Sequence, residues 1–96
     1  MTTIRNGAFV PGITQNFATS GSSSHSNAVS ATTGIVRVAV NQDTYVTVGT
    51  NNPTANVNCM LMPAGDVEWF ACMESSSQIA FIQVSTAGII SITELG

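Results

Sequence analysis

The chain has 96 residues, of which 44% are hydrophobic and only 7% are charged, and its formal net charge is −3. This length suits one domain. Two Arg and no Lys cannot neutralise the phosphates of a nucleic acid, so the composition argues against nucleic-acid binding. No run approaches the ~18 apolar residues of a membrane helix. No signal peptide is visible either, so we expect no membrane partner and synthesis in a cytoplasm.

Two compositions meet near Ala31. Residues 1–31 are rich in Ser, Thr, Gly and Asn, as linkers and arms are, whereas residues 32–96 alternate short apolar segments with turn signals. We therefore predict an extended polar N-terminal arm over 1–31 and an antiparallel β domain over 32–96. An edge strand in "NAVSA" is compatible with the arm. The alternative is an N-terminal strand and loop that belong to the same domain.

The β domain is predicted to contain six strands, because apolar and polar residues alternate in six short segments. In chain order the segments are "GIVRVAV", "TYVTVG", "VNCMLM", "DVEWFACM", "SQIAFIQV" and "IISITEL". Strands of this length and spacing are typical of a small antiparallel β-sandwich or barrel, jelly-roll-like in architecture. Gly, Pro and β-branched residues interrupt every candidate helix. The fold class is therefore all-β.

Two short connections are predicted to close hairpins. "NQD" joins the first two strands, and "PAG" joins the third and fourth, so that Met62 would lie opposite Val67. In the fourth strand, Trp69 shares a face with Val67, and we expect Trp69 to pack inward on that face. Cys59 and Cys72 are expected to be buried free thiols.

Few residues are candidates for chemistry. Asp66 and Glu68 form the only close carboxylate pair, about 6.5–7 Å apart on one strand face, which suits a cation, acid–base chemistry or simply a solvated strand end. His25 lies in "GSSSHSN", a segment poorly suited to hold a catalytic base. One His and two separated Cys do not form an ordinary zinc site. We predict a non-enzymatic protein with no cofactor and no metal.

The segments "VRVAVNQDTYVTVGTNNPTA" and "MLMPAGDVEWFACMESSSQIAFIQVSTAGIISITEL" resemble small virion-associated proteins of tailed bacteriophages. The shared features are a Tyr-Val strand, an Asn-Pro-Thr-Ala loop, a Pro-Ala-Gly turn before an aromatic pair, and a final Thr-Glu-Leu. The resemblance implies a virion protein made in the host cytoplasm, most specifically a capsid decoration (cement) protein bound to the major capsid protein or another virion protein. A head–tail or tail component is the alternative, followed by a carbohydrate-binding β-sandwich.

Assembly is the remaining expectation. The segment "MLM" is apolar on both faces, which predicts subunit contacts through Met60, Met62 and Phe70. A capsid offers three-fold positions, so a homotrimer is preferred and a dimer is the alternative. The arm is expected to dock on the capsid through apolar anchors. These anchors are Ile4, Phe9, Val10, Ile13 and Phe17.

Overall fold

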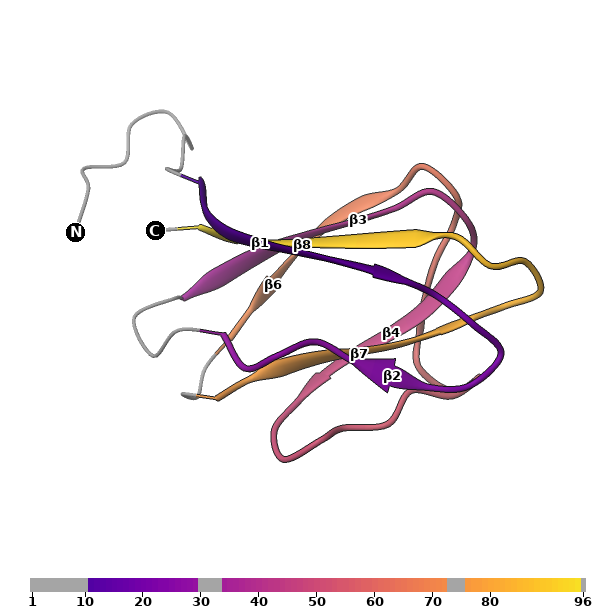
Figure 1. Ribbon diagram of the computed structural model, residues 1–96, viewed down its shortest axis with the longest axis horizontal. Coiled ribbons are helices and arrows are strands. Elements are labelled where there is room, and N and C mark those ends of the chain that lie inside the picture. The colour runs from indigo at the N-terminus through magenta and orange to yellow at the C-terminus, as the bar shows by residue number, and fades with distance from the viewer. Residues whose placement is uncertain (1–10, 30–33, 73–75, 96) are drawn as a thin grey trace.

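The structure is a computed structural model that describes residues 11–29, 34–72 and 76–95. These residues form eight β-strands and no helix, so nothing among them could span a membrane as a helix. Figure 1 shows the strands in two layers. They are β1 (Pro11–Ala18), β2 (Ser24–His25), β3 (Ile35–Val40), β4 (Thr44–Gly49), β5 (Met60–Met62), β6 (Val67–Ala71), β7 (Gln78–Gln83) and β8 (Ile89–Leu95).

The strands form two antiparallel four-stranded sheets. Sheet A has the order β1-β8-β3-β6, and sheet B has the order β2-β7-β4-β5. The chain is thus nested: β1 pairs with β8, β2 with β7, β3 with β6 and β4 with β5. This nesting is the strand order of an eight-stranded jelly roll. The predicted all-β sandwich is confirmed.

The two predicted hairpins are wrong, because both connections pass from one sheet to the other. β3 and β6 lie in sheet A, whereas β4 and β5 lie in sheet B. The "PAG" turn does form, with the Asp66 amide donating to the Pro63 carbonyl at 2.9 Å and Gly65 at φ 82°. Gly65 N also donates to Val40 O at 2.9 Å, which holds the two sheet-crossing corners together.

Residues 11–29 belong to the sandwich. β1 pairs with β8 over most of its length, with a bulge between Pro11 and Thr14, and β2 pairs with β7. Ser26 and Val29, which follow β2, are buried. The alternative of an N-terminal strand within the same domain therefore describes residues 11–29, while the rest of the predicted arm, 1–10 and 30–31, lies outside the described residues.

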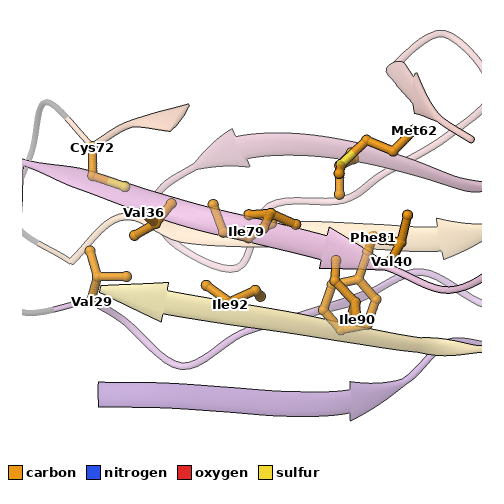
Figure 2. Close-up of a cluster of buried hydrophobic side chains, with 11 residues drawn as sticks. Val29, Val36, Val40, Met62, Cys72, Ile79, Phe81, Ile90 and Ile92 are labelled. Carbon is orange, nitrogen blue, oxygen red and sulfur yellow. The ribbon is translucent and has the colours of Figure 1, made fainter. Parts of the chain in front are cut away.

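The core lies between the two sheets and is almost entirely aliphatic (Figure 2). It is held together by apolar burial and by one aromatic contact, in which the Phe17 and Phe81 rings lie 5.6 Å apart and tilted at 34°. Its buried members are Val29, Val36, Val38, Val40, Val46, Met62, Cys72, Ile79, Phe81, Ile90 and Ile92.

Candidate docking surface on the outer face of sheet A

Strand β6 presents Trp69 on the outside of the sandwich. Its register with β3 pairs Val36 with Phe70 and Val38 with Glu68. Val36 and Val38 are fully buried between the sheets, so Phe70 and Glu68 share the inward side and the alternate residues point outward. Trp69 is accordingly 56% exposed. The prediction that Trp69 packs in the core is wrong.

The outer face of sheet A is formed by alternate residues of all four strands, and we call it the Trp69 face. Each of these residues is exposed or half-buried. They are Thr14, Asn16 and Ala18 of β1; Ile89, Ser91 and Thr93 of β8; Ile35, Arg37 and Ala39 of β3; and Val67, Trp69 and Ala71 of β6.

The Trp69 face has two chemically different halves. The half on β3 and β6 is apolar apart from Arg37. The half on β1 and β8 carries mostly hydroxyl and amide groups, and the Thr14 and Thr93 hydroxyls are hydrogen-bonded at 2.9 Å. The register places Thr14, Thr93, Arg37 and Trp69 in one row across the sheet. Arg37 is the only charged member of the face, and it makes no ion pair with the described residues.

The outer face of sheet B is different, because the β4–β5 connection is bonded across part of it. The Asn52 amide donates to the Gln78 side-chain oxygen at 2.9 Å, and the Ala55 amide donates to Ser23 Oγ at 2.8 Å. Ala55 is buried, and so is Ala80, an outward-facing residue of β7. Sheet B therefore has a partly covered outer face, whereas the Trp69 face is open.

The three residues predicted at subunit contacts have different positions. Met62 is fully buried and belongs to the core, so its prediction as a contact residue is wrong. Phe70 is half-buried against the core. Met60 is 43% exposed, because β5 is a short edge strand whose first residue lies at the margin of the sandwich. The outward residue of β5 is Leu61, which is 50% exposed.

The predicted arm anchors are also divided. Phe17 packs against the core beside Phe81, as a strand residue does, and is only half-buried. Ile13 is 64% exposed at the β1 bulge and is available for contact. The other three anchors, Ile4, Phe9 and Val10, lie outside the described residues.

The candidate chemical groups do not converge. A hydrogen bond with Asp66 raises the pKa of Glu68. Repulsion between the two carboxylates and slight desolvation raise this pKa further. Among the described residues no group of three possible metal ligands occurs. His25 Nδ1 lies 2.9 Å from both the Gln78 side-chain nitrogen and the Ser26 carbonyl oxygen, so its contacts are structural.

The two cysteines differ in environment. Burial raises the pKa of the Cys72 thiol, and the Glu94 carboxylate raises it further. Cys72 is buried as expected, but Cys59 is only half-buried, beside Asn56 in the β4–β5 connection. Both are free thiols, since Cys59 precedes β5 in sheet B and Cys72 follows β6 in sheet A.

Sequence reasoning missed the Trp69 face as a unit. Its members come from four segments that are far apart in the chain, and alternation shows only that residues share a side of their own strand. The available signal was in β6, where Val67, Trp69 and Ala71 are apolar although Phe70 and Cys72 already supply an apolar inward side. A strand that is apolar on both sides indicates a second covering surface.

Comparison with known proteins finds no relative: no family model, curated protein or solved structure matches the chain.

Proposed function

We propose that this protein is a non-enzymatic structural component of a tailed-bacteriophage particle, specifically a decoration protein that bridges neighbouring capsid subunits and stabilises the head. The observation that carries the proposal is the open Trp69 face. It combines an exposed Trp with four further apolar side chains on β3 and β6, and it holds one charge. Such a surface suits packing against another protein, because desolvating it removes apolar area from water and few charges.

The size of the face supports this role. Four strands about 4.8 Å apart, each crossing six residues at about 3.3 Å, give a projected area of about 400 Å². About half of this area, on β3 and β6, is apolar, and contiguous apolar patches of a few hundred Å² are often functional. The low charge of the chain adds to this, since electrostatic repulsion between copies or partners is weak.

Fold and sequence pattern point the same way. The eight-stranded jelly roll is an architecture of viral capsid domains, although a fold alone does not determine function. The resemblance of the segments around "NNPTA" and "MLMPAG" to virion proteins supplies the more specific indication. The expected partner is the major capsid protein or another virion protein. A head–tail or tail component would use the same surface at a different place in the particle.

A carbohydrate-binding module is the second candidate, and one observation favours it. Trp69 is exposed on the outer face of sheet A in the same row as Arg37 and Thr93, so a ring platform and hydrogen-bonding groups lie on one face. Jelly rolls also occur among lectins. A glycan array separates the two candidates: binding that is lost in Trp69→Ala would favour the sugar-binding module, and no binding would favour the structural role.

The proposed role is tested on particles made with and without the gene that encodes the chain. We expect particles without the protein to release their genome at a lower temperature, and added wild-type protein to restore the higher one. Trp69→Glu should fail to restore it. Leu61→Glu is the matched control, because it places the same charge at a similarly exposed apolar position on sheet B. Two results would refute the proposal: particles without the protein that are as heat-stable as wild-type particles, and wild-type particles that carry no copies of the protein.

A further inference from the structure

The position of Arg37 limits what can cover the Trp69 face. Arg37 lies on β3, one of the two inner strands of sheet A, with Trp69 of β6 on one side and Thr93 of β8 on the other, and its outward neighbours along β3 are apolar. A partner that covers this half of the face removes the guanidinium from water. The partner must then supply an acceptor, ideally a carboxylate, since a buried charge without a partner is strongly unfavourable.

The same chain carries suitable carboxylates at one end of the sandwich. Asp43 lies in the β3–β4 corner, and Asp66 closes the β5–β6 turn beside it, since the Ala64 amide donates to Asp43 Oδ1 at 2.8 Å. Glu68 is half-buried on the same side of β6 as Asp66, and the two carboxylates are close enough to repel each other. We call this region, together with the exposed tip Pro63–Gly65, the acidic end. Of the described acidic residues only Glu94 lies elsewhere, buried near Cys72.

A symmetric contact between two Trp69 faces is unfavourable. Packing these faces on each other around a two-fold axis through their centre would place the two Arg37 side chains close together. None of the twelve residues of the face is acidic, so neither guanidinium would find a carboxylate. The complementary surface is the acidic end, which presents several carboxylates and a small apolar tip.

We propose that the Trp69 face of one copy binds the acidic end of the next copy, with Arg37 paired to Asp66 and Glu68 across the contact. The face and the end are different surfaces, so this contact is head-to-tail, and repetition about an axis closes a ring. A ring of three fits the three-fold positions of a capsid. The inference deepens the proposed function by naming the occupant of the Trp69 face, and the number three rests on that function.

The available area limits the size of each contact in the ring. A specific interface buries about 800 Å² on each partner. The Trp69 face alone has a projected area of about 400 Å², and its accessible area is larger because side chains project from it. Each head-to-tail contact uses one Trp69 face and one acidic end, so it lies at the lower end of interface sizes, and each copy of a closed ring makes two such contacts.

Charge reversal tests the pairing in solution, without particles. Sedimentation equilibrium should show that wild-type chain forms a small closed oligomer. Arg37→Glu alone, and Asp66→Lys with Glu68→Lys, should each raise the dissociation constant at least tenfold. The triple variant with all three changes should recover to within about threefold of wild type, because the pairing is restored with reversed signs. Far-UV circular dichroism establishes that each variant is folded, and Asp66→Asn with Glu68→Gln replaces the lysine pair if that pair unfolds.

Three outcomes would overturn the inference: a wild-type chain that stays monomeric at 100 μM, reversal variants that assemble like wild type, or a folded triple variant that does not recover. With the neutral pair, assembly equal to wild type would also overturn it. The two proposals fail separately. A monomer that still decorates particles refutes the ring alone, whereas a ring that never binds particles refutes the decoration role alone.

Discussion

Replacing Phe81 with Ala tests whether the two sheets are held together by the core described above. Phe81 is 1% exposed and comes from the middle of β7, and its ring lies 5.6 Å from that of Phe17 in the other sheet. Removal of a fully buried ring loses its transfer free energy and leaves a cavity, which together cost about 3–5 kcal/mol. About 0.5–1.5 kcal/mol of this belongs to the ring pair. We therefore expect Phe81→Ala to lower the free energy of unfolding by about 4 kcal/mol.

Urea unfolding followed by far-UV circular dichroism measures this loss, and an unchanged denaturant slope would show that only stability has changed. Ile82→Ala is the control, since Ile82 is the next residue of β7, points to the opposite side and is half-buried. Ile82→Ala should lower the free energy of unfolding by about 1–2 kcal/mol, less than truncation of a fully buried side chain does. A double-mutant cycle with Phe17→Ala isolates the ring pair. Equal costs for Phe81→Ala and Ile82→Ala would contradict the packing of β7.

Three further results are expected. Iodide should quench Trp69 fluorescence in the dilute chain, and Trp69→Ala should cost less than about 2 kcal/mol, against about 3–5 for a buried Trp; poor quenching would contradict the outward register of β6. Because burial raises the pKa of Cys72 in the folded state, the folded protein keeps its full stability below about pH 8.5 and loses part of it as the pH rises through the folded-state pKa. Cys72→Ala should therefore show a weaker decline of the urea midpoint between about pH 7 and 10 than the wild type. Equal declines in the two proteins would argue against a buried thiol. Deleting residues 2–29 removes β1 and β2 and should leave a chain without cooperative thermal unfolding; a deletion variant that melts like the full chain would restore the separate arm.

The strands themselves were largely predictable. Alternation at Val36, Val38 and Val40 identifies both the strand and its buried side, and the same holds at Val46. The third predicted strand is shorter than expected, because the Cys59 amide donates to the Asn56 carbonyl in a turn just before β5.

The partners of the strands were not predictable in the same way. A short connection between two antiparallel segments closes a hairpin or crosses to the facing sheet, and the inward residues alternate identically in both cases. "NQD" and "PAG" are compatible with either arrangement. What selects the crossing is long-range pairing, such as Val36 with both Phe70 and Glu94, which no local pattern contains.

The errors at the candidate site have the same origin. Trp69 and Phe70 are neighbours, so they point to opposite sides of β6, and the apolar Val67 beside Trp69, against the carboxylates Asp66 and Glu68 on the side of Phe70, favoured Trp69 as the inward residue. The register with β3 places Phe70 opposite the buried Val36, so Phe70 is the residue that faces the core. Residues 11–29 have the polar composition of a linker, yet the edge strand β1 needs only one apolar side, here supplied by Phe17, and Val29 reaches the core from the chain that follows β2.

Hydroxyl-radical footprinting, read out by mass spectrometry, tests most directly whether the Trp69 face is the covered surface. The reactivities of Trp69 and Leu61 are compared within the same chain, first dilute and then assembled as the isolated oligomer or on particles. Both residues are about half exposed in the single chain, at 56% and 50%. We predict that assembly lowers the oxidation rate of Trp69 at least fivefold and leaves that of Leu61 nearly unchanged. A Trp69 that reacts equally in both states, or protection of Leu61 in its place, would contradict the assignment of this face.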